Sequence, residues 1–580
     1  MYNHMSAISK SNKMVKPTSL MLSFVTALLL SQGYCHGTSS DKKFDSTNGY
    51  DIRTMNVKHP TAYIVQMCYT KTVDENGKAH NPCFACHVQN RPPNYVYEDD
   101  GLQAAYDFPA TAQVNPNSNN FKDFSKAVKK ISDEEIIKYV NQSNYFDANR
   151  TIILANKLRH LPKTWDFNGD GVWSGYIPDC YYNFDKNGFD HSPDGKPTGW
   201  VAFAYMPFLG TFWPTNGSTD DVLIRLDKPF RQLIKSDKFN PTVYKVNLAI
   251  VESLIKRKNI SINPVDENMF GVDLNKDGKL DTASQITYDW APNKGRYMSY
   301  VGYAKTLQEQ GLLHLAAGLY PEGTEFLHSV RYIKSSPDGN ISVAPRMKEL
   351  RYGKKLIWLT YADLKNKGSE ELKEADLDDS NKIETFRGNM ETGLGNNLGW
   401  VYQGFIENKY GNLRPDSYEE TLSCMGCHSG IGVITDSTFA FPRKLDNFRH
   451  GWYHWSKKHY LKGIPERKYS DGTWEFTHYL KLNSSGNEFR TNKEVKNKFF
   501  LKDGKFNSSA IERLHKDVSE LLYPSYKRAI MLDKAYRAIV ETQLFIDGKA
   551  AHIKPLKNVY KSVQSGKSTH NKIYNPPTPK

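Results

Sequence analysis

The chain has 580 residues, with 77 Lys and Arg against 63 Asp and Glu, and a formal net charge of +14. This length predicts several domains. The chain has no basic run interleaved with aromatic residues, which argues against a nucleic-acid-binding surface. Beyond the N-terminal segment, no stretch of about 18 apolar residues occurs, so we expect no membrane-spanning helix in the mature chain.

The first 33 residues have the pattern of a secretory signal peptide. Three lysines and no acidic residue precede Ser19, an apolar run follows from Ser19 to Leu30, and small residues occur at Ser31 and Gly33. The apolar run is short for a bilayer span, and the small residues suit a cleavage site. The sequence therefore predicts export through a signal peptide at residues 1–33, to the periplasm or the cell exterior.

Two other interpretations of this N-terminus remain open. The apolar segment can stay uncleaved as an anchor. Alternatively, Cys35 can carry a lipid, although the bulky Tyr34 directly before it is a poor approach to a lipid-bearing cysteine.

Residues 34–160 contain the first of two matching pentapeptides, Cys83-Phe84-Ala85-Cys86-His87. Two thiols one helical turn apart can add to the two vinyl groups of a porphyrin, and the adjacent imidazole can then bind the iron. Later in this segment Ser132, with Glu135 three positions on, forms a capping box that predicts a helix through Val140.

Residues 161–345 are rich in Gly, Asn, Asp and aromatic residues, which predicts an irregular or β-rich inserted segment. It contains two D-x-N-x-D-G loops. Oxygen ligands at loop positions 1, 3 and 5, followed by Gly at position 6, suit calcium. The predicted calcium ligands are Asp166, Asn168 and Asp170 in the first loop, and Asp273, Asn275, Asp277 and Asp281 in the second. Asx-turns without metal are the alternative.

Residues 346–470 contain the second pentapeptide, Cys424-Met425-Gly426-Cys427-His428. A predicted hairpin over 400–413 precedes it, and Ser417 with Glu420 forms a capping box for the helix that carries the motif. The two motifs lie 341 positions apart, whereas a structural zinc site would keep its ligands closer in sequence. A redox CxxC pair does not require a histidine after both copies.

The segment 471–580 is predicted to be a helical C-terminal region with a polar tail, and Thr473 to Tyr479 has the alternation of a strand. Cys68 and Cys180 are left over from the motifs. In an oxidising compartment they favour a disulfide, with buried free thiols as the alternative.

On the two pentapeptides the chain resembles the c-type cytochromes, specifically a di-haem one. This resemblance implies two covalently bound haem c groups, held by Cys83, Cys86, Cys424 and Cys427, with proximal iron ligands at His87 and His428. The residues considered as distal iron ligands are His450, His454, His80 and His59. The implied fold is mixed. It would be mainly α and cytochrome c-like in the haem-bearing segments 34–160 and 346–470, with the inserted segment between them.

The resemblance implies electron transfer between redox partners, and the positive net charge would suit an acidic partner protein. The alternative is a di-haem oxidoreductase that uses one haem for chemistry and the other for electron storage. Its parts are similar to those of bacterial di-haem peroxidases and MauG-like enzymes, but there the motifs lie much closer together. No catalytic residue is assigned on this basis.

Overall fold

The computed structural model describes residues 53, 57–73, 78–80, 83, 86, 92–93, 105–234, 236–373, 381–429, 435–445, 451–483 and 492–570. His87, His450 and the predicted signal peptide lie outside this range. The features described below belong to the unit that extends from Tyr50 to Lys580.

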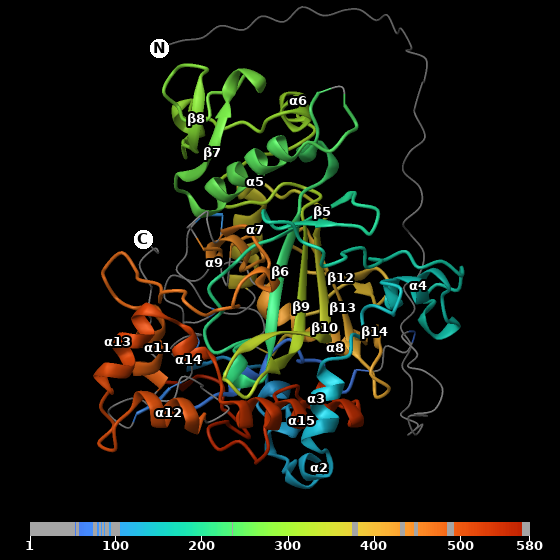
Figure 1. The fold of residues 1–580 in the computed structure, drawn as a ribbon, viewed down its shortest axis with the longest axis vertical. Coiled ribbons are helices and arrows are strands. Elements are labelled where there is room, and N and C mark those ends of the chain that lie inside the picture. The colour runs from blue at the N-terminus through green and yellow to red at the C-terminus, as the bar shows by residue number, and fades with distance from the viewer. Residues whose placement is uncertain are drawn as a thin grey trace, which may run out of the picture. The chain divides into compact units, whose positions relative to one another are not determined.

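A large antiparallel sheet organises this unit (Figure 1). Its strand order is β11-β12-β13-β10-β9-β6-β5-β4, and β14 pairs with β13 beside this path. The strands are β4 (Phe189–His191), β5 (Pro197–Ala202), β6 (Thr219–Arg225), β9 (Glu325–Ser335), β10 (Ile341–Lys355), β11 (Gly388–Asn389), β12 (Gly393–Gly395), β13 (Trp400–Glu407) and β14 (Leu413–Pro415).

The hairpin of β9 and β10 forms the centre of this sheet. Leu350 pairs with Ser329 of β9 and with Phe405 of β13, so β10 is hydrogen-bonded on both edges. Register shifts near Met347 interrupt the pairing of β10 with β9. Most residues of both strands are buried, including charged ones, so neither strand shows a plain alternation of apolar and polar residues.

The remaining strands among the described residues form two-stranded sheets: β1 (Thr72–Val73) with β2 (Ala79–His80), β3 (Ala105–Tyr106) with β15 (Lys567–Ser568), and β7 (Ile260–Asp266) with β8 (Thr282–Ile286). The helices are α2 (Ser125–Lys130), α3 (Asp133–Val140), α4 (Ile153–Arg159), α5 (Pro241–Lys256), α6 (Tyr303–Glu309), α7 (Tyr361–Lys373), α8 (Tyr418–His428), α9 (Ala440–Arg443), α11 (Glu475–Asn483), α12 (Lys493–Phe499), α13 (Ser508–Lys516), α14 (Ser519–Leu522) and α15 (Tyr526–Thr542).

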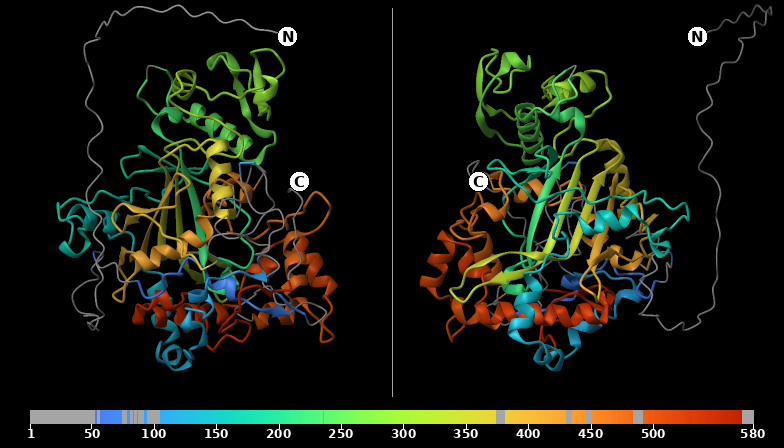
Figure 2. Two further views of the ribbon diagram at one scale, coloured as in Figure 1. Left: turned by 180° about the vertical axis from the view of Figure 1, so that it is seen from behind. Right: turned by 45° about the vertical axis from the view of Figure 1, so that its right-hand side comes forward.

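Helices from both ends of the chain cover the same end of the long strands. α15 contacts α2, α3 and β9, and α3 also contacts β10 (Figure 2). At the other end, α5 packs against β7 (Figure 1). A continuous core joins these layers, with Trp200, Trp213 and Trp400 among its largest buried side chains. The first and last thirds of the chain are therefore packed together around the central sheet.

Several local predictions are confirmed. The Ser132 side chain accepts the backbone N–H of Glu135 at the start of α3. Ser417 and Glu420 form a reciprocal capping box at the start of α8, and β13 with β14 forms the predicted hairpin. The predicted strand at 473–479 is wrong, because α11 begins at Glu475.

The prediction of a mainly α, cytochrome c-like fold is wrong. The dominant element is the large antiparallel sheet, whose strands extend from Phe189 to Pro415. The prediction treated each pentapeptide as the centre of a helical module, but only the second one lies on a helix, α8. The central strands were missed because burial on both faces removes the alternation by which strands are recognised.

Candidate ligand-binding cavity

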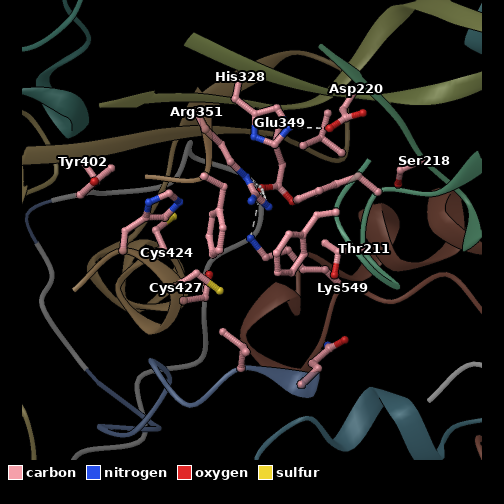
Figure 3. Close-up of a pocket in the computed structure, with 18 of the residues that line it drawn as sticks. Thr211, Ser218, Asp220, His328, Glu349, Arg351, Tyr402, Cys424, Cys427 and Lys549 are labelled. Atoms are coloured by element: carbon pink, nitrogen blue, oxygen red, sulfur yellow. Dashed lines mark hydrogen bonds and ion pairs between the residues drawn. The ribbon is translucent and has the colours of Figure 1, made fainter. Parts of the chain in front are cut away.

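A cavity of about 360 Å³ lies where the large sheet, α8 and the segment of residues 57–67, called the N-terminal segment below, meet (Figure 3). This volume is within the range of small-molecule binding pockets. β6, β9, β10 and β13 contribute one part of the wall, and α8 contributes another. Cys86, Cys424, Cys427 and His428 all line it, so residues of both pentapeptides reach one shared cavity.

Helix α8 holds the second pentapeptide at the cavity wall. Leu422 and Met425 are buried in the core, whereas Cys424, Cys427 and His428 are half-buried toward the cavity. This division follows the helical period, because residues three or four apart share a face. The capping box fixes the beginning of the helix, and its orientation sets the positions of the two thiols.

A buried ion pair fixes α8 further. Glu420 accepts two hydrogen bonds from the Arg414 guanidinium, both 2.8 Å long, and a third from the backbone N–H of Ser417 at 2.7 Å. Burial raises the pKa of Glu420, but Arg414 outweighs this effect and holds the pKa below its usual value. A carboxylate with this many donors stays ionised and keeps the helix in place.

The N-terminal segment packs directly on α8. The Glu419 carboxylate accepts the backbone N–H groups of Lys58 at 2.8 Å and His59 at 2.7 Å. Farther along the helix, a Cβ placed on Gly426 would lie 1.9 Å from the carbonyl oxygen of Tyr63. Gly426, inside the second pentapeptide, therefore allows a backbone contact that no other residue type could make.

Thiols of both pentapeptides line the cavity, and those of Cys86 and Cys427 shift each other's pKa. Interaction with the Cys86 thiol lowers the pKa of Cys427, burial opposes this effect, and the positive charge of Arg351 lowers the pKa further. The pKa of Cys86 is raised well above its usual value by interaction with Cys427 and by burial. Cys427 is therefore the more acidic thiol of the pair.

Two further cysteines lie near this pair. Burial raises the pKa of Cys424 to about 11, although Arg351 and Lys549 oppose it. Burial, reinforced by the charge of Cys427, raises the pKa of Cys68 to about 12. No disulfide joins any of the described cysteines, so the predicted Cys68–Cys180 bond is absent; Cys180 is buried beside Tyr145 and Asp190.

His428 faces the cavity as a neutral imidazole. Burial lowers its pKa to about 4, although the hydrogen bond to Ser437 raises it. Because the ring is neutral near pH 7, Nδ1–H donates to the Ser437 carbonyl oxygen 2.7 Å away. The ring lies 4.7 Å from the Tyr402 ring, measured between centroids.

Arg351 and Lys549 form a cationic pair at the cavity wall, close to Cys424. Arg351 Nη2 and Lys549 Nζ both contact Glu349 Oε2, at 2.7 and 3.4 Å, and Figure 3 shows the three side chains grouped together. Burial raises the pKa of Glu349, but Arg351 and Lys549 reverse this and bring it to about 2. Two cations thus share one carboxylate, which leaves a net positive charge at this wall.

Asp416 lies behind this wall and can change its charge. Burial raises its pKa to about 7; Lys549 opposes that rise, while Glu420 and Glu349 add to it. Among the described groups no hydrogen-bond partner reaches its Oδ1. Asp416 therefore gains a proton near neutral pH, well above the pH at which an exposed aspartate does so.

A histidine and an aspartate occupy a third part of the wall. His328 Nε2 lies 3.1 Å from Asp220 Oδ2, and Figure 3 shows this contact. The His328 ring packs edge-on against Phe212 with centroids 4.9 Å apart. Charged and aromatic groups therefore alternate around the cavity.

The residues considered as distal iron ligands occupy other positions. His454 is buried, stacks on Phe184 and lies 3.0 Å from Asp221 Oδ2. His80 is a buried residue of β2. His59 Nε2 lies 3.4 Å from Asp547. His454 and His59 therefore contact carboxylates, and the structure gathers none of the three with His428 in a metal-binding group.

The two loops predicted to bind calcium are Asx-turns. Asp166 accepts the backbone N–H groups of Gly169 and Gly171, and Asn168 accepts that of Asp170. These side chains stabilise the turn itself.

The second loop repeats this arrangement. Asp273 accepts the N–H groups of Asp277 and Gly278, Asn275 Oδ1 also accepts that of Asp277, and the N–H of Asp281 donates to Glu267. The described residues contain no group of three or more His, Cys, Asp or Glu arranged to hold a metal ion. The prediction of bound calcium is therefore wrong.

Sequence reasoning missed the charged residues of the cavity wall, Asp220, His328, Glu349, Arg351 and Lys549. A signal for two of them exists in β10. Glu349 and Arg351 are two positions apart in a largely buried strand, so they lie on one face of the sheet. Lys549 and Asp220 come from distant parts of the chain, and only the fold brings them to this place.

Known proteins similar to this chain point to a membrane-anchored class. A family model described as a lipoprotein family matches residues 52–518. A protein of Aquifex aeolicus (strain VF5), whose printed name is "Uncharacterized lipoprotein", is 31% identical over 587 residues, which cover 92% of this chain and 91% of that protein. No solved structure matches. None of the helices in the described part of the chain has the length and apolar character needed to cross a bilayer.

These findings overturn the haem interpretation. A di-haem cytochrome would offer each pentapeptide its own haem pocket, but here Cys86 and Cys427, from different pentapeptides, line one shared cavity. The predicted haem cofactors, the electron-transfer function and the di-haem oxidoreductase alternative are wrong. The lipoprotein family supports the prediction of export. With the family model covering most of its length, the chain belongs to this family of lipoproteins.

Proposed function

We propose that this chain is a lipid-anchored binding protein outside the cytoplasmic membrane, and that its cavity holds a small ligand with an aromatic body and an acidic group. The observation that carries the proposal is the cavity of about 360 Å³, with an aromatic wall and a shared Arg351–Lys549 cationic site. Cavities of this size with a few convergent polar groups are typical ligand sites.

The attachment point in this proposal is Cys35. It is the first cysteine after the apolar run of residues 19–30. A lipid at this position would tether the chain on the periplasmic side. The chain from Cys35 onward lacks Lys10, Lys13 and Lys16, and its remaining net charge of 14 − 3 = +11 would favour contact with anionic headgroups. Replacing Cys35 by Ser should move the protein from the membrane to the soluble fraction and abolish labelling with radioactive palmitate. The variant Ser39→Ala, with an unchanged Cys35, should remain in the membrane; palmitate labelling that survives Cys35→Ser would contradict this assignment.

The aromatic wall explains why an aromatic ligand is favoured. The side chains of Phe, Tyr and Trp that line the cavity are Phe203, Tyr205, Phe208, Phe212, Trp213, Phe326, Tyr352, Tyr402, Phe439, Tyr536 and Phe545. Rings of this kind bind a flat apolar molecule through large contact areas and through edge or offset stacking. An aliphatic ligand would gain the area but not the stacking.

The cationic site explains why an acidic group is favoured. Arg351 donates from Nε to Glu349 at 2.8 Å, while its side chain remains 29% exposed toward the cavity. Lys549 is also partly exposed, at 19%. A carboxylate or sulfonate entering here would accept hydrogen bonds from both cations, and charge-assisted bonds of this type are strong. A cationic ligand would meet the net positive charge instead.

A fluorescence titration with anilinonaphthalene sulfonate, an anionic aromatic probe, tests this proposal. We expect saturable binding at one site, and at least about tenfold weaker binding to the double variant Arg351→Met/Lys549→Met, which corresponds to about 1.4 kcal/mol. The control Lys462→Met removes an exposed lysine and should bind like the natural protein. Equal affinity in all three proteins, or no saturable binding, would contradict the proposal.

A further inference from the structure

We propose that His328, oriented by Asp220, accepts a hydrogen bond from a hydroxyl group of the ligand, and that the ligand is an aromatic hydroxy acid. This inference rests on the proposed function and deepens it, because it names the second polar group that the cavity recognises. The hydroxyl lies close to the acidic group of the ligand, since the residues that bind the two groups are neighbours in the sheet.

One face of the large sheet forms the part of the cavity wall that carries these groups. Residues two positions apart on three neighbouring strands line the cavity: Asp220 and Val222 of β6, His328 and Val330 of β9, and Glu349 and Arg351 of β10. Successive side chains of a strand point to opposite faces, so these residues share one face. Polar side chains therefore cross this face of the sheet from Asp220 through His328 to Arg351.

Asp220 fixes the tautomer of the His328 ring. Its Oδ2 lies 3.1 Å from Nε2 of the imidazole, and its side chain is only 4% exposed. A carboxylate can only accept a hydrogen bond, so Nε2 carries the proton of the neutral ring. The other ring nitrogen, Nδ1, is then a hydrogen-bond acceptor.

This acceptor is open to the cavity. Among the described residues, Nε2 of the His328 ring has a hydrogen-bond partner and Nδ1 has none. The side chain keeps 21% of its surface exposed and lines the cavity. The ring also packs edge-on against Phe212, which restricts its rotation. A fixed acceptor in a cavity wall is the kind of polar group that orients a bound ligand.

The neighbouring cation determines which hydrogen-bond donor fits. His328 and Arg351 are directly paired in the register of β9 and β10, and Figure 3 shows their side chains next to each other. Directly paired residues have Cβ atoms about 5 Å apart. A ligand ammonium group at His328 would be repelled by Arg351, whereas a hydroxyl is neutral and can donate to Nδ1. The short separation also places this hydroxyl beside the acidic group that Arg351 binds.

A displacement titration tests the inference. Phenylacetate and the two enantiomers of mandelate compete with anilinonaphthalene sulfonate; mandelate differs from phenylacetate by one hydroxyl beside the carboxylate. In the natural protein we expect the better mandelate enantiomer to bind at least about tenfold more tightly than phenylacetate, because phenylacetate leaves the acceptor unpaired. This preference should disappear in His328→Phe. It should persist in His314→Phe, which removes a histidine that contacts Glu322 outside the cavity lining.

A second variant tests the role of Asp220 as a positioning residue. In Asp220→Asn the amide can donate to Nε2, which moves the ring proton to Nδ1 and turns the acceptor into a donor. We expect this variant to lose most of the preference for mandelate although His328 is still present. Circular dichroism checks that each variant is folded.

Two results would overturn the inference while leaving the proposed function intact. One is equal affinity of the natural protein for mandelate and phenylacetate, with the anionic probe still bound at one site. The other is a preference for mandelate that survives in folded His328→Phe. Failure of the probe itself to bind the natural protein would contradict the proposed function, and the inference with it.

Discussion

The two pentapeptides share the pattern CxxCH but are built differently. The second lies in the last two turns of α8, a helix that begins at a reciprocal capping box and is fixed by a buried ion pair. At the first, the described residues Cys83 and Cys86 are joined by a single turn-type hydrogen bond. Residues upstream of the first pentapeptide, from Lys58 to Tyr63, contact α8 at Glu419 and Gly426.

This difference shows what a short motif can and cannot specify. The same cysteine spacing was interpreted as two equivalent cofactor sites, whereas the molecule uses the two copies as unequal halves of one cavity wall. The flanking residues create the difference. Ser417 and Glu420 cap the helix that carries Cys424, whereas Thr72 and Val73, upstream of Cys83, lie in strand β1.

We expect the largest effect on stability from the buried Arg414–Glu420 ion pair, which holds the helix of the second pentapeptide. Glu420→Gln leaves the Arg414 guanidinium buried without its counter-charge, and we expect a loss of about 3–5 kcal/mol in the free energy of unfolding. Chemical denaturation measures this loss. The control Glu134→Gln changes an exposed carboxylate of α3 and should cost a few tenths of a kcal/mol, about the scale of surface substitutions. Equal midpoints for the two variants would show that Arg414–Glu420 does not hold α8.

A second test concerns the contact between Tyr63 and Gly426 of α8. In Gly426→Ala the new Cβ would meet the Tyr63 carbonyl oxygen at 1.9 Å, so we expect the N-terminal segment to shift and stability to fall by about 1–3 kcal/mol. Gly395→Ala is the matched control, because its Cβ would have its nearest neighbour at 3.6 Å. If both variants have the same denaturation midpoint, the proposed docking of Tyr63 on α8 is wrong.

The third prediction concerns the pH dependence of stability, to which Asp416 behind the cavity wall contributes. Burial first, and then Glu420 and Glu349, raise the pKa of Asp416 from 3.8 to about 7. Between about pH 7 and pH 4 the folded protein therefore holds a proton that the unfolded chain releases. In that window this group makes the protein more stable as the pH falls, by up to about 1.4 kcal/mol per pH unit.

The variant Asp416→Asn removes this proton uptake. Unfolding measured from pH 8 to pH 4.5 should show a smaller rise in stability on acidification than the natural protein shows, since the amide is neutral throughout. Identical slopes in the two proteins would mean that Asp416 titrates normally and stays charged across this window.

The smallest effect is expected from the helix cap. Ser417→Ala removes the side-chain acceptor for the N–H of Glu420, which should cost about 1 kcal/mol. Ser132→Ala removes the equivalent acceptor of α3, which lies outside the cavity wall, and should cost about as much. Only Ser417→Ala should also change the rate at which Cys427 is alkylated. Equal alkylation rates in the two variants would show that the cap of α8 does not influence the reactivity of Cys427.

The sequence predicted features whose causes are local. The caps at Ser132 and Ser417 depend on residues three positions apart, and the β13–β14 hairpin depends on a short turn, so all three could be recognised. The central sheet could not be recognised, because its strands bury charged residues such as Arg346 and Glu349 among apolar ones.

The candidate site shows the same division. The cysteines of both motifs could be selected from their spacing alone, and Cys86, Cys424 and Cys427 do line the cavity. The meeting of both motifs at one cavity could not be predicted, because it depends on the folding together of residues that are 341 positions apart.

The alkylation rate of Cys427 tests most directly whether residues of the two pentapeptides share one ligand cavity. The reduced protein is treated with iodoacetamide with and without saturating anilinonaphthalene sulfonate, and the modified peptide is quantified over time. We predict that the probe slows alkylation of Cys427 several-fold in the natural protein, but has little effect in Arg351→Met/Lys549→Met, where it binds weakly. An unchanged rate at a probe concentration that saturates the natural protein would contradict the account.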